Sequence, residues 1–178
     1  MYFHPSAQDR WQVGHGAFGY TARHENSHLY NCGVLSPEWR ARSEAERSYF
    51  VFSTVRNPFD RLISSWKYLQ STRDRTLLDA LRHPPQLGHD YRHFTRPQIA
   101  IVRDATSGAL VTDFLVRFEH LQDDFNVVCD RLGKPRRALP HLNGSQRQCS
   151  YRQYFDLETR QLAEAMFAED IAAFGYKF

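Results

Sequence analysis

The stretch YFVFSTVRNPFDRLISSW, at residues 49–66, constrains the fold more than any other part of the chain. Its first seven residues, Tyr49 to Val55, are mostly aromatic or β-branched and predict a buried strand. Arg56 then ends the apolar run. Asn57 is a favourable N-cap, and Pro58 suits the first helical position, because proline has no N–H to leave unsatisfied there. The sequence therefore predicts a strand that leads directly into a helix, with one arginine at the junction.

This junction predicts a site for an anion, most naturally a phosphate. Backbone N–H groups at the start of the helix, the positive end of its dipole and the Arg56 guanidinium converge there. The alternative is an ordinary strand-to-helix turn in which Arg56 pairs with a carboxylate. Spacing alone leaves both interpretations open.

The same segment resembles the 3′-phosphate-binding segment of the sulfotransferases that use 3′-phosphoadenosine 5′-phosphosulfate (PAPS), particularly their carbohydrate-type branch, which includes the uronyl 2-O-sulfotransferases and the bacterial sulfotransferase family 2. In that family, an arginine at a strand end and a serine eight residues later hold the 3′-phosphate, and the matching positions here are Arg56 and Ser64. Several blocks in one order are more specific than a single motif. The resemblance continues in the family's order through RPQ at 96–98, DFLVRFEHLQDDFNVVCDRLG at 113–133, LPHLNGS at 139–145 and YFDLETRQLAEAMFAEDIAAFGYKF at 154–178.

The resemblance implies a fold and a reaction. We expect an α/β fold with a P-loop-like parallel sheet flanked by helices, in a single domain over residues 1–178. The implied enzyme moves a sulfuryl group from PAPS to a hydroxyl of a glycan or glycolipid and needs no metal. Two alternatives are a catalytically inactive relative that binds adenosine 3′,5′-bisphosphate or an anionic glycan, and an arginine-rich module for a polyanion such as RNA. Nucleic-acid binding is not expected, because basic residues interleaved with stacking aromatics on one face are not evident.

Local patterns place the remaining elements around the first strand. Strands that alternate with helices predict a parallel α/β sheet whose ligands bind at the carboxyl ends of the strands. The expected elements are an irregular region at 1–35, a second strand at 111–119, a loop at 83–94, and helices at 37–47, 58–70, 76–82, 97–103, 121–132 and from Asp156 to near the end.

The resemblance also suggests a catalytic base and further nucleotide contacts. Histidine suits proton transfer near neutral pH. Among nine histidines, His15 lies in VGHGAFGY, which resembles the glycine-histidine segment that carries the proposed base in uronyl-type 2-O-sulfotransferases, although its gap to Arg56 is longer. The alternative is a flexible Gly-His-Gly loop. Asn143 and Ser145 recur in the family near the nucleotide, and a turn built on Asn-Gly explains them equally well.

The segment after the junction helix is the expected acceptor-binding lid. Tyr91, Arg92 and Arg96 are available there for a sugar or a carboxylate. Gln98 either lines the acceptor cleft or caps a helix, and we favour the structural role. Glu119 is expected to be a buried acid with a scaffolding role.

Three histidines in the same loop raise the question of a metal site. His83, His89 and His93 match no familiar zinc spacing, so we expect no metal.

The amino-terminal part departs from the family pattern. Family members begin with a strand and a P-K-T-G-x-T-S loop, whose amides and lysine grip the 5′-phosphosulfate. Neither the loop nor an early lysine occurs here, since the first lysine is Lys67. The explanations are a sequence that begins late, a fragment or a natural pseudoenzyme, and we favour the first. We expect these 178 residues alone to transfer sulfate poorly, because the leaving oxygen lacks its usual stabilising donors.

Composition and cysteine usage set the cellular context. The net charge is +3, and all but three of the 23 basic residues are arginine, which matches phosphate, sulfate and carboxylate groups well. The excess also follows from genomic base composition. No apolar run approaches a membrane span or a signal peptide, so we expect a cytoplasmic protein. Cys32, Cys129 and Cys149 are odd in number and suggest reduced thiols, with Cys129 in the core.

Overall fold

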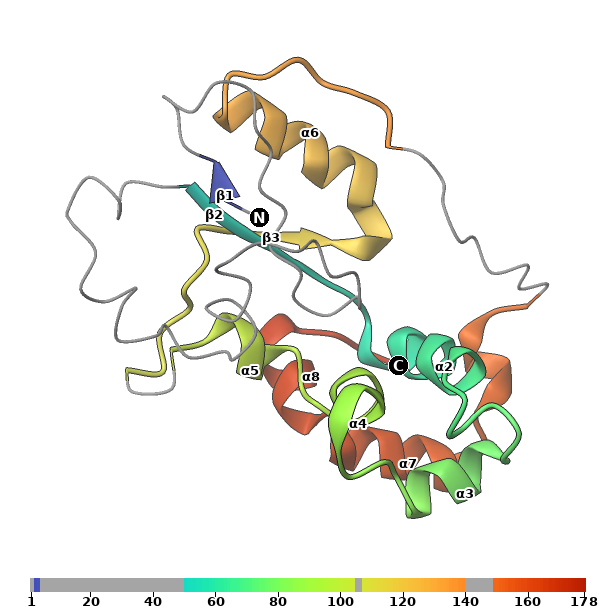
Figure 1. Ribbon diagram of the computed structural model, residues 1–178. Helices are drawn as coiled ribbons and strands as arrows, with labels where there is room; N and C mark the ends of the chain where they lie inside the picture. Colours follow the sequence, from blue (N-terminus) through green and yellow to red (C-terminus); the bar gives the residue numbers. More distant parts are fainter. Residues whose placement is uncertain (1, 4–49, 105–106, 140–148) are drawn as a thin grey trace. The chain divides into compact units, whose positions relative to one another are not determined.

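The computed structural model describes residues 2–3, 50–104, 107–139 and 149–178 (Figure 1). The sequence-predicted His15, Asn143, Ser145 and the helix at 37–47 lie outside these residues. Backbone contacts divide the chain into two compact units, which are described separately. The sheet unit takes its described residues from positions up to 55 and from 98 to 139. The helical unit takes them from 56–97 and from position 149 to the end. The single domain expected over residues 1–178 stays a prediction.

Among its described residues, the sheet unit contains three strands in the order β1-β2-β3. The strand predicted at 49–55 is present as β2 (Phe50–Val55), which pairs in parallel with β3 (Phe114–Arg117). The short β1 (Tyr2–Phe3) joins β2 on its other side and runs antiparallel to it. The parallel pair confirms the α/β class.

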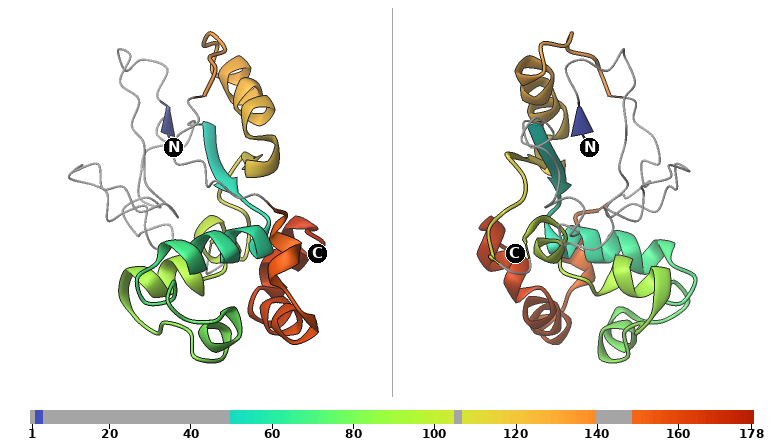
Figure 2. Two further views of the ribbon diagram at one scale, coloured as in Figure 1. Left: turned by 90° about the vertical axis from the view of Figure 1, so that its right-hand side faces the viewer. Right: turned by 60° about the vertical axis from the view of Figure 1, so that its left-hand side comes forward.

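A helix covers the parallel pair of strands. It is α6 (Leu121–Arg131), which lies beside the strands in Figure 2. Its Val128 packs with Phe52 of β2 and Val116 of β3 in one buried cluster. The backbone N–H of Arg117 donates to the Asp124 carboxylate at 2.6 Å and ties the end of β3 to the same helix. The unit also contains α5 (Ile99–Val102).

The second strand is shorter than predicted. Residues Phe118–His120 form a 3-10 turn (η3) that leads into α6. Glu119 lies in this turn and is exposed, so the expectation of a buried acid was wrong. Cys129 of α6 is buried, as predicted.

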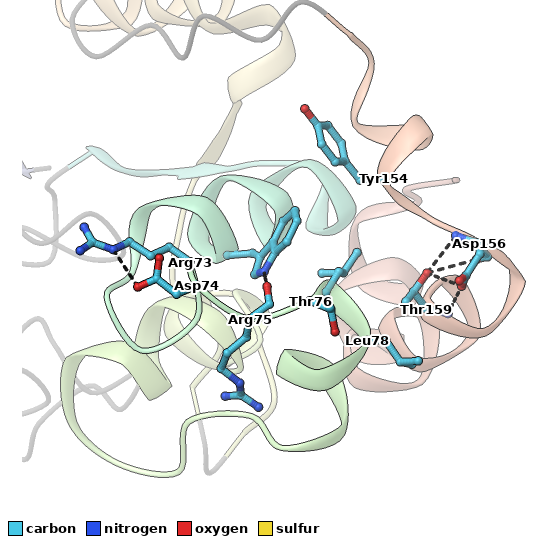
Figure 3. Close-up of a pocket in the computed structure, with 10 residues that line it drawn as sticks. Arg73, Asp74, Arg75, Thr76, Leu78, Tyr154, Asp156 and Thr159 are labelled. Atoms are coloured by element: carbon cyan, nitrogen blue, oxygen red, sulfur yellow. Dashed lines mark hydrogen bonds and ion pairs between the residues drawn. The ribbon is translucent and has the colours of Figure 1, made fainter.

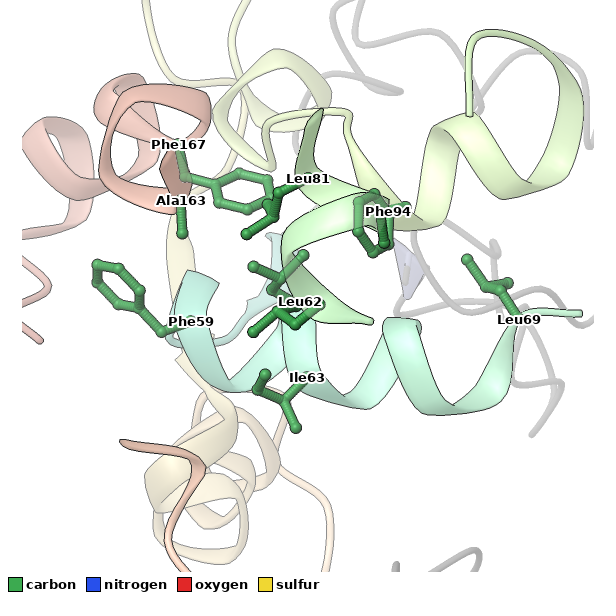
Figure 4. Close-up of a cluster of buried hydrophobic side chains, with 10 residues drawn as sticks. Phe59, Leu62, Ile63, Leu69, Leu81, Phe94, Ala163 and Phe167 are labelled. Carbon is green, nitrogen blue, oxygen red and sulfur yellow. The ribbon is translucent and has the colours of Figure 1, made fainter. Parts of the chain in front are cut away.

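The helical unit packs around α2, the helix that the junction sequence predicts. Phe59, Leu62 and Ile63 of α2 lie in one buried cluster with Phe94 and Phe167 (Figure 4). The elements of this unit are α2 (Pro58–Tyr68), α3 (Leu77–Arg82), α4 (Gly88–Phe94), the 3-10 helix η4 (Tyr151–Tyr154), α7 (Leu157–Met166) and α8 (Ala168–Phe174).

Two elements of the helical unit differ from the sequence prediction. Residues 83–94 were expected to form a loop, but their second half is α4, which begins at Gly88 with φ +72 and ends on the fully buried Phe94. The single C-terminal helix is in fact two. Phe167 leaves helical geometry at φ −113, ψ 23 and is itself buried, which separates α7 from α8.

Within the described residues, none of the helices has the length and apolar character needed to cross a membrane.

Candidate functional site

The start of α2 is fixed by its cap residue, Asn57. The Asn57 Oδ1 accepts a hydrogen bond from the Phe59 N–H at 3.0 Å, which confirms the predicted N-cap. Its Nδ2 group donates to the Tyr151 hydroxyl and to the Lys177 carbonyl, each at 3.3 Å. The first turn of α2 is therefore attached to η4 and to the C-terminal segment, and its geometry does not depend on local sequence alone.

Arg56 precedes this cap and is paired with a carboxylate. Its Nε donates to the Asp60 Oδ2 at 2.6 Å, and its Nη2 lies 2.5 Å from the same oxygen. The side chain is largely buried, with 8% of the residue exposed. The carboxylate-pair interpretation of Arg56 is therefore correct for the structure as it stands. The pair does not exclude an anion, because a guanidinium carries five donors in a planar fork.

Ser64 lies on the same side of α2 as this pair. Asp60 and Ser64 are four residues apart in the helix and so share one face, and Arg56 reaches that face through Asp60. Lys67, three residues after Ser64, extends the face. Its Nζ donates to the Tyr154 hydroxyl at 2.5 Å and lies 3.9 Å from the centre of the Tyr154 ring. We call Arg56, Asp60, Ser64 and Lys67 the basic face of α2.

Arg61 lies within α2 and is a second buried arginine beside Arg56, and sequence reasoning missed it. Its guanidinium donates to the carbonyls of His93 at 3.4 Å and Arg96 at 2.9 Å, and lies 3.9 Å from the Asp170 carboxylate. Burial lowers the pKa of Arg61 to about 10, opposed by Asp170 and assisted by the positive charge of Arg56. Its position within the apolar run of α2, next to Leu62, was the available signal.

The predicted acceptor residues fall in both units. Tyr91 and Arg92 lie on α4 and are exposed, and Arg96 follows the end of that helix. Gln98 belongs to the sheet unit, where it is 4% exposed and occupies the N-cap position of α5 without a side-chain capping bond. The structure thus brings Tyr91, Arg92 and Arg96 together on one segment.

The three histidines near α4 each have local partners. The Nδ1 of His83 lies 3.0 Å from the Asp79 carboxylate, and that of His89 lies 3.1 Å from the Asp90 carboxylate. The rings of His89 and His93 are 4.2 Å apart. Burial, reinforced by His89 and Arg61, lowers the pKa of His93 to about 4. Across the ranges that the structure describes, no three side chains of the metal-binding types gather into a group.

A surface hollow of about 600 Å³ also opens on the helical unit. Trp66, Thr76 and Tyr154 are among the residues that line it (Figure 3). Of the sequence-predicted site residues that the structure describes, none lines this hollow. Trp66 and Ser64 are two residues apart in α2 and therefore point to nearly opposite faces. The hollow borders the basic face of α2 only at Tyr154, which Lys67 contacts, and the chemistry favours the basic face as the anion site.

Comparison with known proteins decides the family. The family model described as "Sulfotransferase family" matches residues 21–177. The chain belongs to the sulfotransferase family. The searches of curated proteins and of solved structures gave no match. The matched range contains the basic face of α2 and residues 91–98 of this sulfotransferase, whereas His15 lies before it.

Proposed function

We propose that this sulfotransferase takes its sulfuryl group from PAPS and transfers it to a hydroxyl of a glycan or glycolipid. The observation that carries the proposal is the start of α2, where Arg56 and Ser64 serve one helix face in a chain matched by the sulfotransferase family model. A nucleotide with a 3′-phosphate is the ligand that this pair suits, because arginine binds phosphate through two parallel N–H donors.

The roles of the residues follow from this assignment. Arg56 and Ser64 bind the 3′-phosphate, and Lys67 adds positive charge on the same face. The phosphate competes with Asp60 for Arg56, and its larger negative charge together with the positive end of the α2 dipole favours the phosphate. The remaining assignments are nucleotide contacts by Asn143 and Ser145, and acceptor contacts by Tyr91, Arg92, Arg96 and Gln98.

Sulfuryl transfer needs a base for the acceptor hydroxyl, and we assign this role to His15. In-line attack on sulfur releases a proton from the hydroxyl while adenosine 3′,5′-bisphosphate leaves. The base contacts the acceptor and not the nucleotide. In protein that turns over PAPS, His15→Ala should lower kcat by about 10²- to 10⁴-fold with unchanged bisphosphate affinity. A near-normal kcat would remove His15 from the mechanism.

The nucleotide assignment is tested by calorimetry with adenosine 3′,5′-bisphosphate. Arg56→Ala should weaken binding by about ten- to a hundredfold, because it removes a charge-assisted contact worth about 1.5–3 kcal/mol. Arg75→Ala is the matched control. Arg75 forms the same kind of ion pair, with the Asp79 carboxylate at 2.6 Å, but lies outside α2. Equal affinity of the folded Arg56→Ala variant and the wild type would overturn the assignment.

A second candidate function is binding of adenosine 3′,5′-bisphosphate or an anionic glycan without transfer. Labelled PAPS separates the two functions. Transfer of the label to a glycan supports the enzyme, and bisphosphate binding without transfer supports the binding protein.

A further inference from the structure

Arg61 joins α2 to the end of α4 through hydrogen bonds. It lies one turn beyond the α2 cap and is 4% exposed. The carbonyls that it contacts belong to His93, in the last turn of α4, and to Arg96, just after that helix. Ser65, one turn further along α2, donates its hydroxyl to the same His93 carbonyl at 3.1 Å. Two donors of α2 therefore hold the carbonyl end of α4, where a cation is favoured by the helix dipole.

The other side of Arg61 faces α8. The Asp170 carboxylate is 3.9 Å away and fully buried, and the Phe167 ring centre is 5.0 Å from the guanidinium carbon. The buried Nε has no hydrogen-bond partner among the described residues. An apolar side chain is often the more stable choice at such a place, because desolvation of a charge is costly. Packing alone therefore does not explain an arginine at position 61, and its hydrogen bonds to the end of α4 suggest another role.

The charge on Arg61 is also sensitive to its neighbour at the nucleotide end. Arg56 and Arg61 repel each other, and this repulsion adds to burial in disfavouring the charged guanidinium. A phosphate bound at Arg56 brings negative charge that offsets the repulsion. We therefore expect the hydrogen bonds from Arg61 to the His93 and Arg96 carbonyls to tighten when the nucleotide binds.

We propose that Arg61 is a positioning residue that couples nucleotide binding at Arg56 to the ordering of residues 88–96, which carry Tyr91, Arg92 and Arg96. The proposal rests on the proposed function, because it takes the nucleotide site to be at Arg56. Its consequence is an order of events in which the nucleotide binds first and prepares the acceptor segment. Such coupling is a difference in free energy between two sites and can be measured without knowing the acceptor.

Amide hydrogen exchange of the whole chain, with and without adenosine 3′,5′-bisphosphate, tests the coupling. In the wild type, the nucleotide should slow exchange in residues 88–96 by about fivefold or more. Arg61→Lys should bind the nucleotide with nearly unchanged affinity and lose most of this slowing, because an ammonium cannot bridge both carbonyls in the geometry of a planar guanidinium. Ser65→Ala, which removes the second donor to the His93 carbonyl, should lose part of it.

Arg75→Lys is the matched control, since Arg75 donates to the carbonyls of Asp79 and His83 at the end of α3 in the same manner. It should leave the response of residues 88–96 intact. The proposal is overturned if the nucleotide slows these amides equally in the wild type, Arg61→Lys and Ser65→Ala. It is also overturned if Arg61→Lys speeds exchange by the same factor with and without nucleotide, which is the signature of a structural role only. If the wild type does not bind the bisphosphate, the proposed function itself fails.

Discussion

At the residue scale, two arginines near the start of α2 have different surroundings, and we propose different tasks for them. Arg56 is held by the Asp60 carboxylate at the start of α2, where we propose that the 3′-phosphate binds. Arg61 is held mainly by backbone carbonyls and is more deeply buried. A carboxylate partner can give way to a phosphate, whereas carbonyls at a helix end fix a neighbouring segment. The surroundings of Arg56 therefore suit anion binding, and those of Arg61 suit the positioning of a neighbouring segment.

Asn57 was predictable from the sequence as a cap but not in its full role. Its local hydrogen bond follows from residue type and from Pro58 after it. The hydrogen bonds to Tyr151 and Lys177 join residues 94 and 120 positions apart in the sequence. A local sequence pattern does not predict partners that far along the chain. Arg61 and Lys67 were missed for the same reason. Their partners lie on other elements, and spacing within a helix identifies a face but not what covers it.

The extra bonds predict a large stability effect at Asn57. Asn57→Ala should lower the free energy of unfolding by about 2–3 kcal/mol, because it removes a helix cap and two further hydrogen bonds of a buried side chain. Thr76→Ala, which removes only the exposed cap of α3, should cost about 1 kcal/mol or less. Urea denaturation followed by circular dichroism measures both. A loss at Asn57 no larger than that at Thr76 would contradict the three-way anchoring.

At the element scale, the predictions succeeded where the signal was local. The strand before Arg56, the starts of α2, α3 and α7, and the end of α6 near Gly133 follow from cap residues and apolar runs. Helix α4 was missed because Leu87 offers no side-chain cap and Gly88 suggested a turn. The break at Phe167 was missed because the apolar spacing continues through it, and burial of that side chain decides the geometry.

His93, on helix α4, should make the free energy of unfolding depend on pH. His93 lies near His89, Arg61, Arg92 and Asp90, and its pKa falls from 6.5 to about 4 on folding, mainly through burial. The folded state therefore favours the neutral ring, while the unfolded chain takes up a proton below pH 6.5. The stability contributed by the neutral ring is present above about pH 6.5 and is lost as the pH falls from there to 4.

His93→Gln should therefore flatten the fall in unfolding free energy between pH 6.5 and 4. His83→Gln is the control, because the side chain of His83 is 73% exposed and its Nδ1 pairs with the Asp79 carboxylate. Denaturation midpoints at pH 7, 5.5 and 4.5 provide the comparison. Equal slopes for His93→Gln and the wild type would show that the His93 ring does not contribute.

At the scale of the whole molecule, the sequence predicted the family but not where the surface hollow of the helical unit lies. Ordered motif blocks predicted a sulfotransferase with a parallel sheet, and the family match and the β2–β3 pair confirm both. The hollow beside Trp66 and Tyr154 had no counterpart in the sequence, because it forms where α2, α3, η4 and α7 meet. The position of the nucleotide decides between this hollow and the basic face of α2.

A crystal structure of the chain with adenosine 3′,5′-bisphosphate tests that position most directly. We expect the 3′-phosphate oxygens at hydrogen-bond distance, about 3 Å, from the guanidinium of Arg56 and the hydroxyl of Ser64. Asp60 should then share the guanidinium with the phosphate or release it. A 3′-phosphate found in the hollow between Trp66 and Tyr154, with Arg56 still paired only to Asp60, would contradict the account.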